Sequence, residues 1–371
     1  MRILLDYRPA LRQRTGVGAY IHETAQALAG TSSPDESITL FSASWKDRLP
    51  PDVVPPLSVI DRRIPVRLLN LLWHRLEWPA VERVTGRHDD VVQAAHPLLL
   101  PSRMAAQLVT IYDLDFLDHP ERTTAEIRRD YAALAGSHAR RADQVVVIST
   151  HTAQQVERRL GVPASHITIC PPGAPDWSTT DRPSTKRDCL LFLGTLEPRK
   201  NLDVLLEAYA RLVATDPATP RLVLAGRVSD AAADLVRRAQ ATPLSGRVEL
   251  PGYVTEAEKR ALFDRAIVFV LPSHTEGFGM TAAEAMKAGV PVVVADRGAL
   301  PETVGDAGAR FDPDNAEELA NLLRAIVRSP ERQHQMIEAG RRQAAGFTWT
   351  HTANRLRDAW RLAVEHRTAR D

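Results

Sequence analysis

Two carboxylates in a glycine-bearing segment give the strongest indication of chemistry in this sequence. Glu276 lies in the stretch His-Thr-Glu-Gly-Phe-Gly-Met after the apolar run 267–271, and Glu284 lies eight positions later, in a helix-like stretch that stops at Gly289. Even on one continuous helix, this spacing places the two side chains within about 80° of each other. Carboxylates beside a helix N-terminus offer acceptors for hydroxyl groups next to backbone donors for an anion. The pair therefore predicts a site for a ligand with both features, such as a sugar nucleotide.

A second segment with charged residues spans 194–201 and follows the apolar run 190–193. Asn201 is expected to be the N-cap of the next helix, so Arg199 and Lys200 come just before that helix. The dipole at a helix N-terminus disfavours cations, unless an anion lies between them and the helix. The segment therefore predicts contact with a phosphate group, and solvated surface charge is the alternative.

A third loop, 14–20, contains Gly16 and Gly18 and follows the first apolar run. Two glycines let the backbone approach a phosphate at a helix N-terminus. The rival interpretation is a dinucleotide-binding fingerprint, but its third glycine is replaced by Ile21 and the acidic residue that would hold a ribose is missing. A plain tight turn remains the other alternative.

Three polar residues, His96, Tyr112 and Asp113, each follow an expected strand and are weaker candidates for binding a second substrate. Tyr112 can donate and accept hydrogen bonds but cannot act as a base near neutral pH. Asp113 and Asp115 have the spacing of a metal-binding D-x-D motif. We expect no metal here, because Arg, Lys and helix dipoles can neutralise a diphosphate. A structural role is the alternative for His96.

Short apolar runs alternate with helical periodicity along the whole chain, which is typical of parallel α/β sheets. Many of the runs are apolar at consecutive positions, as expected for strands covered on both faces. We therefore expect an α/β protein with two Rossmann-like domains. The expected strands are 2–5, 38–41, 91–93, 108–111, 145–148, 190–193, 222–225, 248–250, 267–271 and 292–295, and the expected helices include 18–29, 68–84, 126–140, 150–160, 202–213, 280–288 and 349–364.

A length of 371 residues favours two domains, and the stretch from Pro171 to about Arg187 is the best linker because it has turn-forming residues and no apolar periodicity. The expected domains are residues 1–172 and 173–350, followed by a C-terminal helix at 351–371. Ligands of open α/β sheets bind beyond the carboxyl ends of the strands. In a two-domain protein those ends would face a cleft.

Composition and charge argue against several classes of protein. A formal net charge of +1 gives little support to nucleic-acid binding, and two cysteines cannot form a disulfide framework. The N-terminus does not resemble a signal peptide, and no apolar run approaches the roughly 20 residues that span a bilayer. We expect a cytoplasmic protein. The basic, leucine-rich segment 62–78 is compatible with contact at the inner face of a membrane, or with a buried helix that has a solvated edge.

The segment Gly-Thr-Leu-Glu-Pro-Arg-Lys-Asn at 194–201, together with the glutamate pair, resembles the retaining glycosyltransferases of family 4, particularly bacterial mannosyltransferases. That resemblance implies the GT-B fold, with an acceptor-side first domain, a nucleotide-sugar-binding second domain and a last helix that packs back on the first. It implies that Glu276, Arg199 and Lys200 are catalytic. The implied donor-binding residues are Gly16, Gly18, Gly194, Thr195, Phe278, Gly279, Met280 and Glu284, and the acceptor-side residues are His96, Tyr112 and Asp113.

The sequence departs from the family pattern at two positions. Many relatives have an arginine where this chain has Thr195, so Arg199 and Lys200 must supply the positive charge. Relatives often have a histidine where this chain has Tyr112, which puts a general base at that position in doubt.

The predicted activity is metal-independent, retaining transfer of a hexose from a nucleotide diphosphate sugar to a glycan or a lipid-linked acceptor, without a cofactor. Mannose is the favoured sugar, and GDP-mannose is favoured over a UDP-sugar. The alternatives are a sugar-nucleotide-binding protein without turnover and an epimerase of the same fold.

Overall fold

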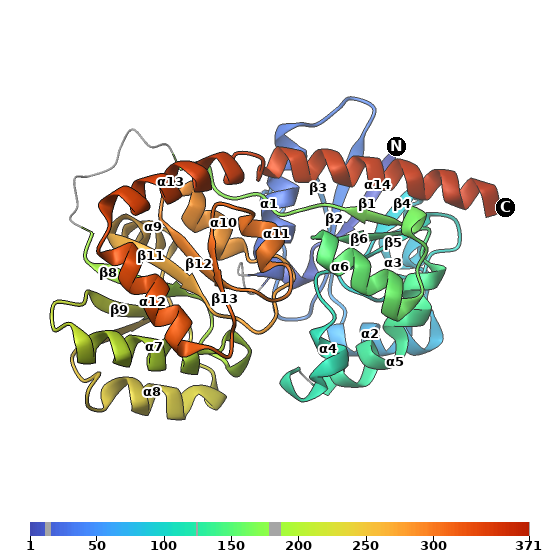
Figure 1. The fold of residues 1–371 in the computed structure, drawn as a ribbon. Helices are drawn as coiled ribbons and strands as arrows, with labels where there is room; N and C mark the ends of the chain where they lie inside the picture. The colour runs from blue at the N-terminus through green and yellow to red at the C-terminus, as the bar shows by residue number, and fades with distance from the viewer. Residues whose placement is uncertain (12–15, 124, 178–186, 371) are drawn as a thin grey trace. The chain divides into compact units, whose positions relative to one another are not determined.

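The computed structural model describes residues 1–11, 16–123, 125–177 and 187–370. Two compact units divide the chain: Met1–Gly173 with Trp349–Asp371, and Ala174–Thr348 (Figure 1). The Arg14 and Thr15 positions of the third loop, and residues 178–186 of the expected linker, lie outside the described residues. In the part of the chain that is described, no helix is long and apolar enough to cross a membrane.

The first unit is built on a parallel sheet of seven strands in the order β3-β2-β1-β4-β5-β6-β7. Central strands are buried on both faces, as their consecutive apolar residues predict: Leu4 and Val109 are inaccessible to solvent. The strands are β1 (Arg2–Asp6), β2 (Ser37–Ala43), β3 (Ser58–Arg62), β4 (Val91–Gln93), β5 (Ala106–Ile111), β6 (Gln144–Val147) and β7 (Ile167–Ile169).

The helices of this unit connect the strands and cover the sheet. The helix expected over 68–84 is wrong, because the chain forms two helices on either side of the cis Trp78–Pro79 bond. Proline lacks the N–H that a continuous helix needs. The helices are α1 (Val17–Gly30), α2 (Val66–Leu76), α3 (Val81–Thr85), α4 (Asp115–Asp118), α5 (Ala125–Arg141), α6 (Thr150–Gln155), which continues as a π-helical turn over Val156–Leu160, and α14 (Trp349–Arg370).

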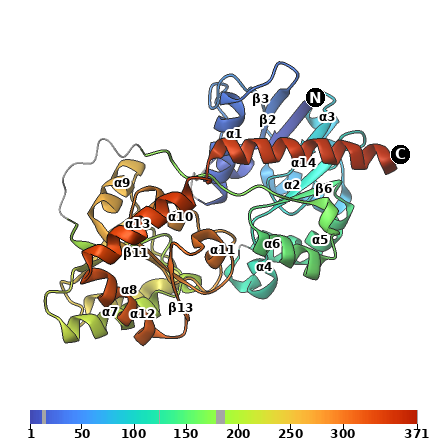
Figure 2. The same ribbon diagram turned by 45° about the horizontal axis from the view of Figure 1, so that its top comes forward.

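The last helix, α14, packs against α1 and against β5, β6 and β7 of the first unit (Figure 2). Trp360 is fully buried, and its indole Nε1 donates to Gln93 Oε1 at 2.7 Å. Arg357 donates through Nε to Glu36 Oε2, also at 2.7 Å. The residues that end the chain are therefore part of the core of the unit that begins it.

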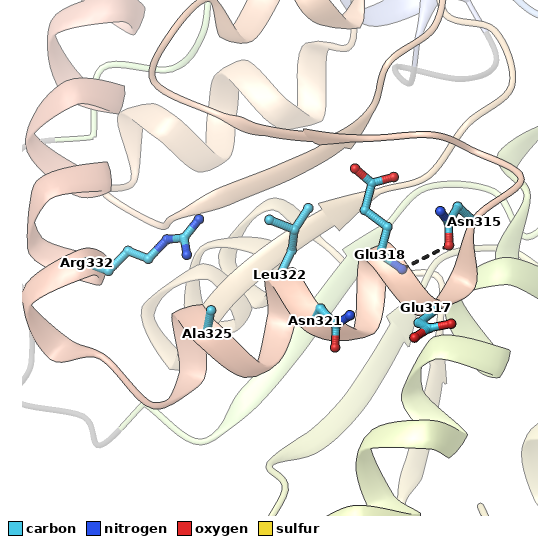
Figure 3. Close-up of a pocket in the computed structure, with 7 residues that line it drawn as sticks. All are labelled: Asn315, Glu317, Glu318, Asn321, Leu322, Ala325 and Arg332. Carbon is cyan, nitrogen blue, oxygen red and sulfur yellow. Dashed lines mark hydrogen bonds between the residues drawn. The ribbon is translucent and has the colours of Figure 1, made fainter.

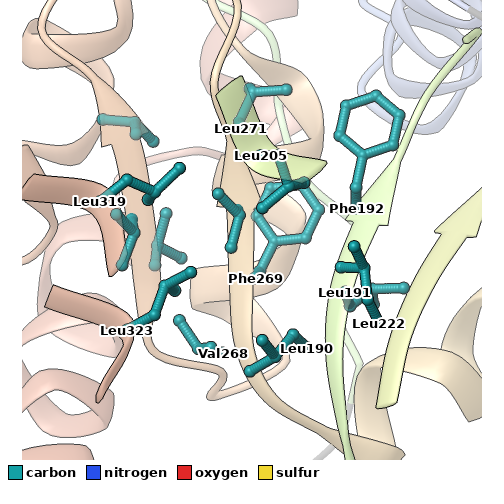
Figure 4. Packing of buried hydrophobic residues seen from close by; sticks show 14 of the residues in the cluster. Leu190, Leu191, Phe192, Leu205, Leu222, Val268, Phe269, Leu271, Leu319 and Leu323 are labelled. Carbon is teal, nitrogen blue, oxygen red and sulfur yellow. The ribbon is translucent and has the colours of Figure 1, made fainter. Parts of the chain in front are cut away.

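The second unit has six parallel strands in the order β10-β9-β8-β11-β12-β13, with a core of leucine, valine and phenylalanine between sheet and helices (Figure 4). The strands β8 and β11, the first and fourth of this unit in chain order, are neighbours in the sheet. After β8 the chain continues to β9 on one side, and after β11 it continues to β12 on the other side. Such a switch point is where ligands of this fold bind. The strands are β8 (Cys189–Leu193), β9 (Arg221–Ala225), β10 (Val248–Gly252), β11 (Ala266–Leu271), β12 (Val292–Ala295) and β13 (Ala309–Phe311), and the helices are α7 (Leu202–Thr215), α8 (Ala233–Gln240), α9 (Glu256–Arg265), α10 (Met280–Lys287), α11 (Leu300–Val304), α12 (Ala316–Val327) and α13 (Pro330–Ala344).

Candidate functional site

The loops that follow β8 and β11 meet at the switch point of the second unit. The backbone N–H of His274, after β11, donates to the carbonyl of Arg199, after β8, at 3.0 Å. This bond ties together two loops that are more than seventy residues apart in the sequence. Arg199, Lys200 and Glu276, which the sequence singled out in separate motifs, are brought into direct contact.

Glu276 is the centre of this contact. Lys200 Nζ lies 2.5 Å from its Oε1, Ser273 Oγ donates to the same oxygen at 2.7 Å, and Arg199 Nη1 lies 3.4 Å from Oε2. Burial raises the pKa of Glu276, but the charges of Lys200 and Arg199 and the hydrogen bonds outweigh it and bring the pKa to about 2. The carboxylate is therefore ionised at neutral pH.

Arg199 contacts two further oxygens besides Glu276 Oε2. Its Nη1 donates to the carbonyl of Thr275 at 2.9 Å, and its Nη2 donates to Glu197 Oε1 at 3.0 Å. Both cations of the loop therefore already pair with carboxylates, rather than forming the bare cationic surface that the sequence suggested. A bound diphosphate would have to share or replace these partners.

Asn201 occupies the N-cap position of α7, as predicted, but it does not cap the helix through its side chain. Its φ of 51° and ψ of 42° place it in the left-handed region, and its side chain makes no capping hydrogen bond to α7. Instead, Nδ2 donates to the carbonyl of Pro313 at 2.8 Å. The residue turns the chain from the Pro198–Lys200 turn into α7 and fastens this turn to the segment after β13.

Glu284 lies in the second turn of α10 and is only 7% exposed. Its Oε1 accepts a hydrogen bond from Lys259 Nζ of α9 at 2.9 Å. Sequence reasoning missed Lys259, because the contact joins two helices and no motif indicates it. A buried carboxylate bound to a buried ammonium group is a fixed acceptor site of the kind that hydroxyl groups need.

Close backbone packing supports the Glu276 loop from behind. Gly298 has a φ of 61°, and a Cβ at that position would lie 2.9 Å from the carbonyl oxygen of Glu276 and 3.0 Å from its nitrogen. The next N–H, of Ala299, donates to the same carbonyl at 3.1 Å. Gly279, with a φ of 95°, turns the loop into α10, while Phe278 is buried and Met280 opens the helix. Gly298 is therefore a supporting residue that the motif search did not find.

The expected contacts at Gly194 and Thr195 lie where β8 ends. Thr195 is exposed, and Gly194 packs so closely on the next loop that a Cβ added to Gly226 would lie 1.9 Å from its carbonyl oxygen. This proximity explains the glycine at position 226. The contact between Gly194 and Gly226 keeps the ends of β8 and β9 close together, beside the loop that carries Arg199.

In the first unit, the candidates follow the carboxyl ends of neighbouring strands. His96 comes after β4 and belongs to a buried cluster with Asp6 and Arg8, which follow or end β1. Arg8 Nε donates to Asp6 Oδ1 at 2.7 Å, and Arg8 Nη2 lies 3.0 Å from His96 Nε2. The N–H of Leu98 donates to His96 Nδ1 at 3.2 Å, and His96 Nε2 also lies 3.5 Å from Asp6 Oδ2. The motif search did not find Asp6 or Arg8, although charges at the end of a buried strand were a visible indication.

Electrostatics make His96 and Tyr112 poor proton acceptors. Burial lowers the pKa of His96 to about 3 despite the nearby carboxylate of Asp6, so the ring is neutral at physiological pH. Burial, with the charge of Asp6 added, raises the pKa of Tyr112 well above its usual value of 10. The sheet end therefore offers these two side chains as neutral hydrogen-bonding groups.

Asp113 and the glycines of the third loop complete this sheet end. Asp113 Oδ1 accepts a hydrogen bond from the N–H of Asp115 at 3.1 Å, while the Asp115 carboxylate lies 3.9 Å from Arg122 Nη1. Gly16, with a φ of 53°, precedes α1, and Gly18 is buried in its first turn. Within the described ranges, no group of three or more His, Cys, Asp and Glu side chains is arranged to hold a metal ion.

A pocket of about 420 Å³ lies elsewhere in the second unit, on α12 and the start of α13 (Figure 3). None of the residues predicted from the sequence lines it. Its lining residues are Asn315, Glu317, Glu318, Asn321, Leu322, Ala325 and Arg332.

Two family models match the chain in succession. Residues 14–176 match Glycosyltransferase Family 4, and residues 176–343 match Glycosyl transferases group 1. The chain is 26% identical to O-antigen chain mannosyltransferase B of Escherichia coli, over 98% of this chain and 100% of that protein.

Among solved structures, sucrose-phosphate synthase from Thermosynechococcus elongatus has a TM-score of 0.77 at 20% identity, over 97% of this chain and 98% of that one. The Anabaena protein HepE in complex with UDP and glucose has a TM-score of 0.73 at 18% identity, over 96% of this chain and 98% of that one. These likenesses confirm the expected α/β fold with two Rossmann-like parallel sheets. The chain is a family 4-like glycosyltransferase with the GT-B fold.

Proposed function

We propose that this glycosyltransferase transfers a hexose from a nucleotide diphosphate sugar to a saccharide or lipid-linked acceptor, with retention of the anomeric configuration and without a metal ion or other cofactor. Mannose is the favoured hexose, and GDP-mannose is favoured over a UDP-sugar. The carrying observation is the contact of Glu276 with Lys200 and Arg199 at the switch point of the second unit. Similarity to a mannosyltransferase over the whole chain supports the choice of sugar.

Each charged group has a distinct task in this proposal. Lys200 and Arg199 stabilise the negative charge that grows on the diphosphate as it leaves, in a site where charges are partly shielded from water. Glu276 accepts hydrogen bonds from hydroxyls of the transferred sugar, and Glu284 accepts them from the ribose. The segment Gly194–Thr195 and the backbone from Phe278 to Met280 lie beside the phosphates. Gly16 and Gly18 provide a further backbone approach to the donor.

The chemical step needs no protein nucleophile. The bond between the anomeric carbon and the diphosphate oxygen breaks, and the acceptor oxygen bonds to the same face of the sugar. The acceptor proton passes to the departing phosphate oxygen. This route suits the first unit, where His96 and Tyr112 are neutral and poor bases, and where Asp113 can orient an acceptor hydroxyl.

A donor screen tests the proposal. We expect GDP-mannose to raise the melting temperature more than UDP-sugars, and to release GDP when an acceptor is present, with unchanged rate in excess EDTA. Analysis of the product's anomeric configuration checks retention. Loss of the rate in EDTA that Mg²⁺ or Mn²⁺ restores would contradict the metal-free mechanism. Binding without release of nucleotide would indicate a binding protein, and an altered free sugar nucleotide would indicate an epimerase.

The exposed face of α2 supports a further part of this proposal, contact with an anionic lipid surface that would carry a lipid-linked acceptor. Leu68 and Leu71 are 50% and 44% exposed, and Trp78 beyond the helix is 53% exposed. Arg63 and Arg67 are exposed beside them. Apolar side chains flanked by arginines are typical of helices that lie in a membrane interface.

Vesicle sedimentation checks this contact. We expect binding to vesicles that contain phosphatidylglycerol, weaker binding to pure phosphatidylcholine, and loss of binding in a Leu68→Ser/Leu71→Ser variant. The matched control is Leu362→Ser, which removes an exposed leucine from α14. Equal binding by both variants and the wild type would contradict a role for α2.

A further inference from the structure

Lys259 is a buried cation to which the proposed function assigns no role. It lies in α9 and is 8% exposed. Its ammonium group contacts Glu284 Oε1 at 2.9 Å and Glu256 Oε2 at 2.8 Å, and it lies 5.7 Å from the centre of the Trp177 ring. Lysines are seldom buried to this extent unless they are paired. The pairing therefore needs an explanation.

The two carboxylates that face the ammonium group are not equivalent. The Glu256 side chain is 77% exposed, so its ion pair is screened by water and contributes little. Glu284 is buried, and removing one partner of a buried pair leaves an uncompensated charge. The ion pair of Lys259 with Glu284 therefore contributes more free energy than its ion pair with Glu256.

Lys259 keeps its positive charge over the physiological range. Burial lowers the pKa of Lys259, but the carboxylates of Glu284 and Glu256 outweigh burial and raise it above the usual 10.5. A raised pKa keeps the ammonium form at every lower pH, so Lys259 remains a cation throughout the neutral range.

The contact between Lys259 and Glu284 also fixes the orientation of the Glu284 carboxylate. Lys259 and Glu284 belong to α9 and α10, which lie on either side of β11 in the chain, so the ion pair joins two separately anchored helices. A carboxylate has about four acceptor positions on its two oxygens. An ammonium group bound to Oε1 restricts the rotation of the carboxylate.

We propose that Lys259 is a positioning residue of the donor site, which holds the Glu284 carboxylate in the orientation that binds the ribose hydroxyls of the nucleotide. This inference depends on the proposed function, because it assumes that a nucleotide binds beside Glu284. Lys259 acts through Glu284 and need not touch the ligand itself.

A thermodynamic cycle between the lysine and the ribose hydroxyls tests the inference. The dissociation constants of GDP and 2′,3′-dideoxy-GDP, and of the matching UDP pair, are measured by calorimetry on the wild type and on Lys259→Met. In the wild type we expect the loss of the hydroxyls to weaken binding about tenfold, which corresponds to roughly 1.4 kcal/mol. In Lys259→Met the same loss should change binding by less than about twofold, because two groups that act together are not additive.

The matched control is Arg265→Met, which removes a cation from the end of the same helix, where Arg265 pairs with Asp188 at 3.0 Å. It should keep the wild-type dependence on the hydroxyls. Should Lys259→Met fail to fold, Lys259→Ala replaces it with the same expected result, because alanine is too short to contact Glu284 and leaves space for water beside the buried carboxylate.

The possible outcomes distinguish a failure of the inference on Lys259 from a failure of the proposed function. Equal weakening of ribose and dideoxyribose nucleotides in Lys259→Met would mean a purely structural lysine, and unchanged binding would mean no role; either result overturns the inference alone. A folded wild-type protein that binds neither GDP nor UDP would overturn the proposed function, and the inference with it.

Discussion

Lys200 Nζ lies 2.5 Å from Glu276 Oε1, so in the proposed mechanism a bound diphosphate would compete with Glu276 for this ammonium group. In Glu276→Gln, the amide keeps the size of the side chain but not its charge, so Lys200 and Arg199 become available to the phosphates. We expect this variant to bind free nucleoside diphosphate as tightly as the wild type or more tightly, while turnover of the sugar nucleotide falls about 10²-fold or more. Calorimetry and an assay of nucleotide release measure the two effects. Weaker nucleotide binding in Glu276→Gln would show that the carboxylate does not compete with the phosphates.

The same carboxylate predicts a pH dependence of stability. Burial raises the pKa of Glu276, but Lys200 and Arg199 lower it from 4.5 to about 2. Because the folded-state value is depressed, the ionised group stabilises the fold above the unfolded value of about 4.5, and this contribution is lost as the pH falls toward 2. The difference in unfolding free energy between the wild type and Glu276→Gln should therefore shrink between about pH 5 and pH 3. Urea titrations at the two pH values check it, and a constant difference would contradict the assigned ion pair.

The sequence predicted Arg199, Lys200 and Glu276 but not their mutual pairing. Each residue type and its place after a strand could be seen in the sequence, whereas Ser273 and Lys259 became visible only once the loops and helices were in contact. Asn201 is the N-cap residue of α7, as predicted, but its side chain bonds to the carbonyl of Pro313 in a distant loop and not to the helix. Contacts between segments far apart in the sequence leave no local pattern.

At the scale of elements, the loop that carries Glu276 depends on the turn at Gly298. An alanine there would place Cβ 2.9 Å from the Glu276 carbonyl oxygen, and its φ of 61° is unfavourable for a side chain. We expect Gly298→Ala to lower the free energy of unfolding by about 1–3 kcal/mol and to reduce turnover, because the loop must move. Chemical denaturation and steady-state kinetics measure the two effects.

Gly246→Ala is the matched control. Gly246 also has a positive φ, of 71°, but no atom lies within 4 Å of its added Cβ. This variant should lose stability through the backbone alone and keep its turnover. If both variants keep full turnover, the Gly298 turn does not set the position of Glu276.

Strands with runs of buried residues were predictable, and most strands that are only partly buried were not. The ten expected strands correspond to strands of the two sheets, and all but the partly buried β10 have runs of buried residues. The missed strands β3, β7 and β13 are only partly buried, whereas β4, which also has three residues, is buried at all of them. The division between α2 and α3 depended on Pro79, which a leucine-rich periodicity concealed.

At the scale of the whole chain, Trp360 of α14 ties the C-terminus into the first unit. Trp360→Ala removes a fully buried ring and leaves Gln93 Oε1 without its indole donor. We expect a loss of about 3–5 kcal/mol in the free energy of unfolding of that unit. The control Leu362→Ala, at a partly exposed position of the same helix, should cost much less.

Most of the proposed donor-binding residues, including Lys200, Glu276 and Glu284, lie in the other unit, which has its own core; Gly16 and Gly18 are the exceptions. Below its melting temperature, Trp360→Ala should therefore bind nucleoside diphosphate within about twofold of the wild type, since distant sites are nearly independent. A large loss of nucleotide affinity in the folded variant would contradict an independent donor site in residues 174–348.

The proposed function of the whole chain requires Lys200 to stabilise the departing diphosphate, with Arg199 in a smaller role. The most direct measurement is kcat/KM for the preferred sugar nucleotide in Lys200→Ala. Its control is Arg211→Ala, which removes an exposed cation of α7 that pairs with Glu207. Circular dichroism verifies that both variants are folded. We predict a decrease of about 10²-fold or more in Lys200→Ala, equivalent to roughly 2.7 kcal/mol of transition-state stabilisation, and little change in the control. A folded Lys200→Ala enzyme with near-normal kcat/KM would show that the leaving group is stabilised elsewhere and would contradict the role assigned to this loop.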